Sequence, residues 1–175
     1  YEVTSVGKVA SMFYFSPFDV ADLRRNFRYI FQNNLQNNDL AISMALGNVD
    51  TNRMNFVSRA EREEMATYMA KVRLKFGDVY NEAAIKAGYS YFALMNGLNL
   101  GAFTSSARGM QVDFPRTEAV LNALDAMAAK WNKKHVFREM GLRITYGVGS
   151  ELLELCRIPD IGKARAEKLY AAGFR

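Results

Sequence analysis

The amino-acid sequence predicts an all-α fold: a helical bundle of about six or seven helices, followed by two short helices joined by a tight turn. Two observations support this prediction. Apolar residues recur along most of the chain at the i, i+3, i+4, i+7 spacing of an amphipathic helix, and Gly, Pro, Asn and Ser separate the periodic segments. Strand pairs joined by a hairpin turn, which indicate an antiparallel sheet, do not occur in the sequence.

The length and composition suit a cytoplasmic protein, or a nuclear one in a eukaryote, rather than a secreted one. The 175 residues suffice for one domain and a small module, and 50% of them are hydrophobic. No run approaches the roughly 18 apolar residues that span a membrane, so we expect no membrane partner. Cys156 is the single cysteine and is expected in the core, in a reducing compartment. Because the chain begins with Tyr1, we expect it to be an excerpt from a longer protein.

Two helices are predicted in the first part of the chain. Residues 4–15 have helical apolar spacing, and Thr4 or Ser5 is placed to cap the start. Asp19 is the expected N-cap of a second helix over about 20–33. Three arginines lie off its apolar stripe and form either a solvated face or a second basic patch: Arg24, Arg25 and Arg28.

The middle of the chain contains three further helix signals. A polar run over 32–38 precedes Asp39, which is expected to cap a short helix. Ser58, with Glu61 three residues later, forms a capping box that starts another helix. A third helix is predicted over about 79–96. Its aromatic residues are either core residues, which helical spacing favours, or stacking platforms for bases: Tyr80, Tyr89, Tyr91 and Phe92.

A loop and a long helix are predicted next. Residues 99–114 are rich in Gly and Ser and indicate a loop or a short irregular helix. Pro115 suits the first turn of a helix over about 115–132. The apolar stripe of that helix consists of Val120, Leu121, Leu124, Met127, Ala128 and Trp131. The opposite face is small enough for a nucleic-acid strand to approach, and it contains Asn122, Ala126, Ala129 and Lys133.

The last part of the chain has the pattern of a helix-hairpin-helix unit. Residues 152–156 and 166–173 have helical spacing, and Pro159 between them lacks the N–H that a continuous helix needs. The second helix then starts with unpaired backbone N–H groups, which form an anion site. The residues that contribute these N–H groups are Gly162, Lys163 and Ala164.

The charge distribution makes a nucleic-acid phosphate the expected anion. Residues 1–129 hold 13 Lys/Arg and 13 Asp/Glu, whereas residues 130–175 hold 10 and 5, so the net charge of +5 lies in the last quarter. A plain αα-corner with solvated charges is the alternative. We therefore predict that nucleic acid contacts Ile161, Gly162, Lys163, Ala164, Arg165, Lys130, Lys133 and Lys134.

No catalytic or metal-binding set of residues emerges. His135 is the single histidine and lies among lysines, without a matching acid or thiol. The Gly-Lys pairs at 7–8 and 162–163 lack both the earlier Gly and the Ser/Thr of a P-loop. We expect this chain to bind without catalysing a reaction alone, and to hold no cofactor.

Two separated segments resemble a known family. TSVGKVASMFYFSP (4–17) is similar to the last winged-helix segment of Ski-like superfamily 2 helicases, although Val6 replaces the usual Leu. ELLELCRIPDIGKARAEKLYAAGFR (151–175) resembles the helix-hairpin-helix of archaeal repair helicases related to HelQ and to the helicase part of polymerase theta. The residues that match the second pattern are Leu152–Leu155, Arg157-Ile158, Ile161-Gly162, Arg165-Ala166, Lys168–Tyr170 and Ala172-Gly173.

The resemblance implies a division of the chain and a role for it. The end of a winged helix would occupy 1–16, a ratchet bundle 17–148, and the helix-hairpin-helix module 149–175. The parent protein would be an ATP-dependent DNA helicase of DNA repair that unwinds in the 3′-to-5′ direction. Its RecA-like motor domains, with their ATP and Mg, would lie outside this chain. The expected partners are these motor domains and single-stranded or branched DNA.

In such helicases one bundle helix acts as a ratchet, with an Arg and a Trp two turns apart that hold a base. Counting back from the hairpin selects residues 115–132. The resemblance therefore implies that Trp131, the single tryptophan, contacts the nucleic acid. However, Leu124 stands two turns before it in place of the Arg, and helical phase favours a core position for Trp131. Other registers place the pair at Val120 and Met127 or at Thr117 and Leu124. Two other functions stay open: a protein-docking module without a motor, and the equivalent part of an RNA helicase.

Overall fold

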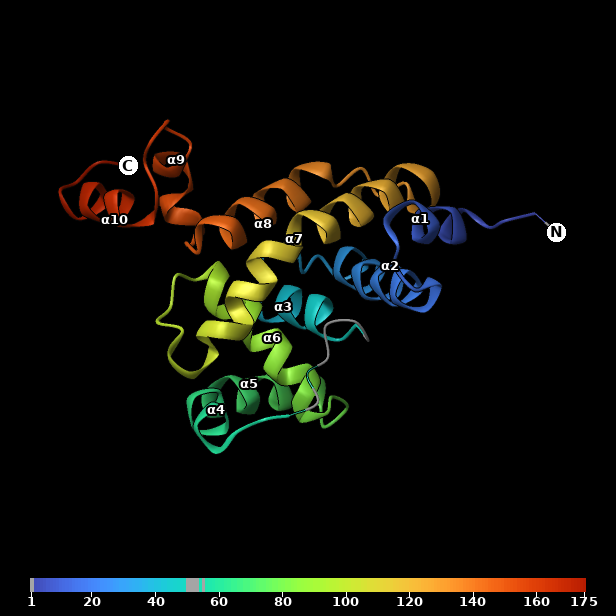
Figure 1. Cartoon of the computed structure of the whole chain (residues 1–175), viewed down its shortest axis with the longest axis horizontal. Coiled ribbons are helices and arrows are strands. Elements are labelled where there is room, and N and C mark those ends of the chain that lie inside the picture. Colours follow the sequence, from blue (N-terminus) through green and yellow to red (C-terminus); the bar gives the residue numbers. More distant parts are fainter. Residues whose placement is uncertain (1, 50–53, 55) are drawn as a thin grey trace.

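The computed structural model, which describes residues 2–49, 54 and 56–175, is all-helical, as the sequence predicts (Figure 1). No strand occurs among these residues. The helices of the described chain are α1 (Ser5–Phe13), α2 (Pro17–Gln32), α3 (Asp39–Gly47), α4 (Arg59–Glu64), α5 (Ala66–Phe76), α6 (Glu82–Met95), α7 (Thr104–Leu124), α8 (Lys134–Tyr146), α9 (Leu153–Cys156) and α10 (Lys163–Ala171).

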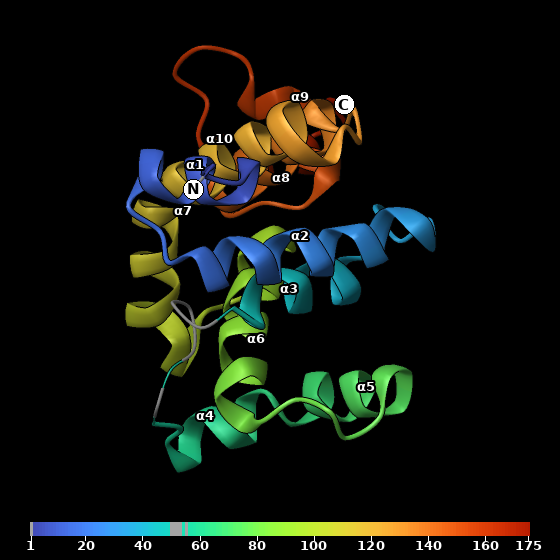
Figure 2. The same ribbon diagram turned by 90° about the vertical axis from the view of Figure 1, so that its right-hand side faces the viewer.

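Helix α7 runs through the middle of the bundle. Helix α8 packs beside it and runs back along it, while α1, α2 and α6 also contact α7. Helices α4 and α5 form a layer on the far side of α6 from α8 (Figure 2). The two short helices α9 and α10 continue beyond the end of α8 and form a terminal arm, residues 150–175, which projects from the bundle (Figure 1).

The buried apolar side chains fall into three clusters. The largest lies among α1, α2, α3, α6, α7 and α8, so Val9 and Ala10 of α1 belong to the same core as the bundle. A second cluster joins α3 and α6 to α5 and to neighbouring connections, with Tyr68 of α5 and Phe103 of the turn before α7 among its largest members. The third is confined to the end of α8 and the terminal arm, and consists of Val148, Leu152, Leu153, Leu155, Cys156 and Ala166.

Helices α3 and α6 cross at an unusually short distance because both have glycine at the crossing. A Cβ atom added to Gly47 would lie 2.4 Å from the backbone N of Gly88 and 3.0 Å from the carbonyl O of Ala84. The space beside Gly88 is also filled, by the sulfur of Met44 and the hydroxyl of Tyr68. This contact brings α3 and α6 together as one unit, on which the other helices pack.

Two of the predicted N-caps are wrong by one or a few residues. Ser16, rather than Asp19, caps α2 through a 3.2 Å bond from a backbone N–H, because Pro17 is suited to the first helical position. Asn38, rather than Asp39, caps α3 through a 3.0 Å bond. The carboxylate of Asp39 is thereby left for a tertiary contact.

The predicted capping box at the start of α4 forms only in part. The hydroxyl of Ser58 accepts the Glu61 N–H at 3.1 Å, as expected. The carboxylate of Glu61 instead pairs with the Lys86 ammonium of α6 at 2.7 Å, and this attaches α4 to the bundle. The helix then breaks at Met65 into α4 and α5.

The largest correction concerns α7. The sequence indicates a loop or a short irregular helix over residues 99–114. Instead, a short 3₁₀ turn over Gly101–Phe103 leads into α7, which begins at Thr104, continues through Pro115 and ends at Leu124. Proline removes one backbone hydrogen bond from the helix interior, and the long buried face of α7 compensates for the loss. That face consists of Ala107, Met110, Phe114, Thr117, Val120, Leu121 and Leu124.

The end of the predicted helix over 115–132 is also wrong. A π-helical turn over Asp125–Ala129 follows α7, and Lys130 ends it with a left-handed φ of 53°. The carboxylate of Asp125 accepts the backbone N–H groups of Asn132 and Lys133 at 2.9 and 2.8 Å. These bonds fold the chain back so that α8 can pack against α7.

We predict that Gly47→Ala destabilises the fold by about 3 kcal/mol, because the new Cβ meets backbone that cannot rotate away. Gly109→Ala in α7 is the matched control, since nothing lies within 4 Å of its Cβ position. That control is expected to leave stability unchanged or to raise it by about 0.5–1 kcal/mol. Urea denaturation followed by circular dichroism measures both, and equal effects would contradict the close crossing.

Candidate nucleic-acid interface

The terminal arm contains the turn in which the sequence predicts an anion site. A 3₁₀ turn over Ser150–Leu152 leads into α9, and α10 starts at Lys163 after the connecting turn. Ala166 of α10 is fully buried against α9, so the two helices pack closely. A hollow of about 370 Å³ adjoins the turn and is lined by Tyr146, Cys156 and residues 157–162.

The first backbone N–H groups of α10 are open to solvent. Gly162 is the N-cap residue, and no side chain caps this helix within the described part of the protein. The N–H groups of Gly162, Lys163 and Ala164 donate to no acceptor among the described residues. Gly162 and Ala164 are exposed, and a Cβ on Gly162 would meet nothing within 4 Å. The positive end of the helix dipole therefore faces solvent, as an anion site requires.

The two neighbouring cations differ in how they are held. The Lys163 ammonium lies 3.4 Å from the carbonyl O of Gly97 in the α6–α7 connection, so it reaches toward the bundle. The Arg165 guanidinium donates to the carbonyl O of Asp160 at 2.6 Å, and it stays exposed beside the turn. Because a guanidinium has five N–H donors, most of its donors stay available. Ile161 is partly buried in the core of the arm.

Cys156 is a core residue of the arm, as predicted. Its side chain is buried among the apolar residues of α9 and α10. Burial raises the pKa of the thiol, and the negative charge of Glu167 raises it further. The thiol is therefore protonated at neutral pH and unreactive as a nucleophile.

The predicted lysines lie at the turn between α7 and α8. Lys130 and Lys134 line a hollow of about 520 Å³ with Asn122 and Ala126, two members of the small face that the sequence indicates. The Lys130 ammonium donates to the carbonyl O of Ala126. Lys133 lies elsewhere: its ammonium is 5.7 Å from the centre of the Phe31 ring.

Trp131 packs against the core, the position that the helical phase favours. Its ring centre lies 5.2 Å from that of Phe31 and 6.3 Å from that of Phe137, and the side chain is only partly exposed. The alternative ratchet registers also lack two solvent-exposed side chains, because the face of α7 that carries them packs against the core. The registers include Thr117, Val120 and Leu124, which are at most 5% exposed.

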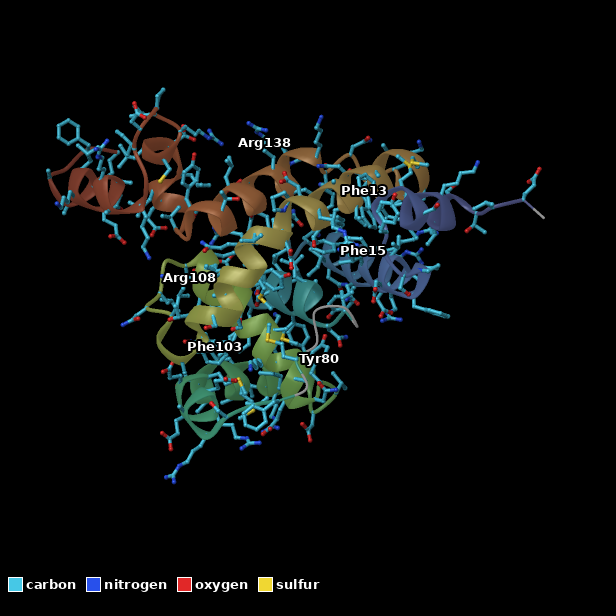
Figure 3. All side chains as sticks on the ribbon, in the orientation of Figure 1. Phe13, Phe15, Tyr80, Phe103, Arg108 and Arg138 are labelled. Carbon is cyan, nitrogen blue, oxygen red and sulfur yellow. The ribbon has the colours of Figure 1, made fainter. Side chains whose placement is uncertain are left out.

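The predicted site residues thus form two regions rather than one. Helix α8 separates the Lys130–Lys134 turn from the terminal arm (Figure 1). Its 13 residues correspond to about 20 Å. The exposed side chain of Arg138 projects from α8 between the two ends (Figure 3).

The structure also exposes a cation on α7 that the sequence interpretation did not single out. Arg108 lies on the solvent face of α7, and Figure 3 places it on the side of α7 where the terminal arm projects. It was missed because the neighbouring Gly and Ser residues suggested a loop or a short irregular helix, for which no solvent face was assigned. The apolar spacing of Ala107, Met110 and Phe114 was the available signal.

The described residues contain no cluster of three or more His, Cys, Asp or Glu side chains placed to hold a metal ion. None of their helices combines the length and apolar character that a membrane crossing demands.

Comparison with known proteins connects the chain to a helicase. No protein-family model matches it. A stretch of 38 residues, 22% of this chain, is 55% identical to the ATP-dependent DNA helicase Hel308 of Thermococcus kodakarensis. The chain contains a helicase-related region. The match spans only 3% of the length of that helicase, so the relationship is shown for this stretch alone.

We predict that Trp131→Ala lowers the melting temperature by about 5–10 °C, because it removes two aromatic contacts from the main core. Phe18→Ala is the control, since Phe18 is 76% exposed and its loss should change the melting temperature little. Differential scanning calorimetry measures both. A stable Trp131→Ala protein that has lost affinity for single-stranded DNA would instead identify Trp131 as a stacking residue.

Proposed function

We propose that this chain is a non-catalytic part of an ATP-dependent DNA helicase and that its terminal arm binds single-stranded DNA. The observation that carries the proposal is the start of α10, where exposed backbone N–H groups have no acceptor within the described chain. The helicase-related stretch supports the choice of DNA as the ligand. The terminal arm then acts as a helix-hairpin-helix module.

In this proposal a phosphate group occupies the start of α10. The N–H groups of Gly162, Lys163 and Ala164 donate to its oxygens, and the helix dipole favours its negative charge. The Lys163 ammonium exchanges the carbonyl O of Gly97, at 3.4 Å, for the phosphate, and Arg165 contributes its remaining donors. Contacts of this kind fix the strand without reading its sequence, as a translocating enzyme requires.

The Lys130–Lys134 turn at the start of α8 extends the proposed path of the strand along this helix. Lys130 and Lys134 line the hollow at one end of this helix, Arg138 is exposed along it, and the terminal arm lies at the other end. Several phosphates of one strand would thus be held at once. Such a grip keeps the strand in place while the motor domains, which bind ATP and Mg outside this chain, return for the next step.

The first test changes Lys163 and Arg165 together to Glu. We expect single-stranded DNA binding by the chain to weaken by at least about tenfold, because two cations become anions beside the phosphate site. The control is Arg25→Glu with Lys75→Glu, which makes the same charge change at exposed positions of α2 and α5. Fluorescence anisotropy with labelled oligo(dT) measures both. Unchanged binding by the variant with Lys163→Glu and Arg165→Glu would disprove the proposed phosphate contact at the start of α10.

Salt and sugar dependence test the nature of the ligand. Each phosphate held on a single strand contributes a slope of about −0.7 to a plot of log K against log salt concentration. We expect a slope that corresponds to several phosphates for the wild-type chain. The variant with Lys163→Glu and Arg165→Glu should give a shallower slope. Equal affinity for oligo(rU) would favour the RNA-helicase alternative.

Loss of binding on Arg108→Glu but not on Arg138→Glu would place the strand across α7 instead of along α8.

A further inference from the structure

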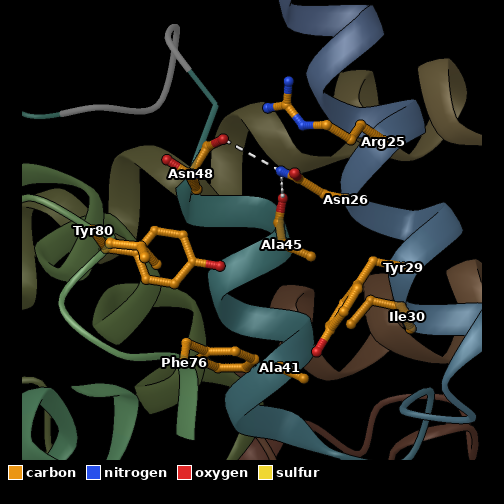
Figure 4. Close-up of a pocket in the computed structure, with 10 residues that line it drawn as sticks. Arg25, Asn26, Tyr29, Ile30, Ala41, Ala45, Asn48, Phe76 and Tyr80 are labelled. Carbon is orange, nitrogen blue, oxygen red and sulfur yellow. Dashed lines mark hydrogen bonds between the residues drawn. The ribbon is translucent and has the colours of Figure 1, made fainter. Parts of the chain in front are cut away.

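A pocket of about 370 Å³ opens between α2, α3 and the α5–α6 connection, away from the terminal arm (Figure 4). Three aromatic rings form its walls, and small or branched apolar residues of α2 and α3 form its floor. The wall residues are Tyr29, Phe76 and Tyr80, and the floor residues are Ile30, Ala41 and Ala45. The proposed DNA-binding function makes no use of this pocket.

The interior of the pocket suits an apolar group better than a nucleobase. The side-chain amide of Asn26, which lies at its edge, already donates to the carbonyl O atoms of Ala45 and Asn48 at 3.0 and 3.3 Å (Figure 4). The floor offers only aliphatic side chains. Polar groups that line the pocket belong to Arg25, Tyr29, Asn48 and Tyr80, whereas the floor beneath them is aliphatic. An aliphatic or aromatic side chain can contact that floor without burying an unpaired polar edge, as a base would.

The rim of the pocket is positively charged. Arg25 of α2 lies on it with a side chain that is 67% exposed, and its ion pair with Asp22 is a surface contact of little energy. On the α5 side, the Lys75 ammonium lies 5.8 Å from the centre of the Phe76 ring. Helix α5 contains three cations and no acidic residue: Lys71, Arg73 and Lys75. Arg73 pairs with the exposed Asp78 of the α5–α6 connection at 3.2 Å, so Lys75 is the α5 cation that the proposal uses.

Exposed apolar surface surrounds the opening. Tyr29 is 50% exposed and Val79 is 72% exposed, although both line the pocket. A bound chain that covered them would remove apolar area from water on both partners, which is the main source of affinity in small docking sites.

We propose that this pocket docks a short acidic segment of a partner protein, which inserts one large apolar side chain between Tyr29, Phe76 and Tyr80. The acidic residues on either side of that side chain pair with Arg25 and with the cations of α5. The aromatic walls provide most of the binding energy, and the charged rim selects acidic partners and speeds association.

The probe is a short fluorescein-labelled peptide of Asp and Glu residues with one central phenylalanine. The control peptide has serine in place of the phenylalanine. We expect the chain to bind the phenylalanine peptide at least about tenfold more tightly, because only that side chain fills the pocket. Fluorescence anisotropy measures both peptides, and amide chemical shifts should change in α2, α3 and residues 76–80.

Two variants address the pocket and one addresses the arm. Ala45→Leu fills the floor, and Arg25→Glu with Lys75→Glu reverses the rim; each should weaken binding of the phenylalanine peptide by about tenfold. Lys163→Glu with Arg165→Glu, which alters the arm, should leave it unchanged. The exposed rim variant keeps the test valid if Ala45→Leu impairs folding.

Three results would overturn the proposal. Equal binding of the two peptides would show that the pocket accepts no side chain. Wild-type affinity of the rim variant for the phenylalanine peptide would show that the charged rim does not contribute. Competition between oligo(dT) and the peptide, with loss of oligo(dT) affinity in the rim variant, would make the pocket a nucleic-acid site. Because the arm variant separates the two regions, failure here is distinguishable from failure of the DNA-binding proposal.

Discussion

The guanidinium of Arg143 holds the arm-bearing helix to the rest of the bundle. It forms a two-point ion pair with Asp39 of α3, at 2.9 and 2.6 Å, and also donates to the carbonyl O of Met95 at the end of α6. Both charged side chains are largely buried, so loss of either would leave an uncompensated charge at a cost of about 3–5 kcal/mol. Together with the packing of α8 against α7 and α6, this contact fixes the direction of α8 and with it the position of the terminal arm.

At the junction between the bundle and the terminal arm, the α6–α7 connection packs closely on the turn that follows α8. Gly147 ends α8 with a left-handed φ of 64°, a conformation that glycine adopts without strain. A Cβ on Gly97 would lie 3.4 Å from the carbonyl O of Gly147, so the α6–α7 connection packs directly on this turn. The amide side chain of Gln111 adds a bond to the carbonyl O of Ile144 at 3.1 Å. The arm is thus held at its base, while the start of α10 stays open to solvent.

The molecule offers two surfaces of different chemistry. Along α8 and the arm, the exposed groups are backbone N–H donors and scattered cations, which are the groups that would contact phosphates in the proposed DNA-binding function. Between α2, α3 and α5, aromatic walls surround an apolar floor, which favours a single inserted side chain. The close crossing of α3 and α6 supports both surfaces, since α8 packs on α6 and the pocket floor includes α3.

The sequence by itself determined the helical class, the cap at Ser58 and the open N–H groups at Gly162, because helical periodicity, capping and proline effects act over a few neighbouring residues. For the first helix it narrowed the cap to Thr4 or Ser5, and the structure selects Thr4. Only the tertiary structure decided that α7 continues through Pro115, since burial of a whole helix face outweighs one lost hydrogen bond. It also decided that Lys130 and Lys134 face one hollow while Lys133 lies over a ring, because side-chain directions after a π-turn follow from packing, which a linear pattern does not contain.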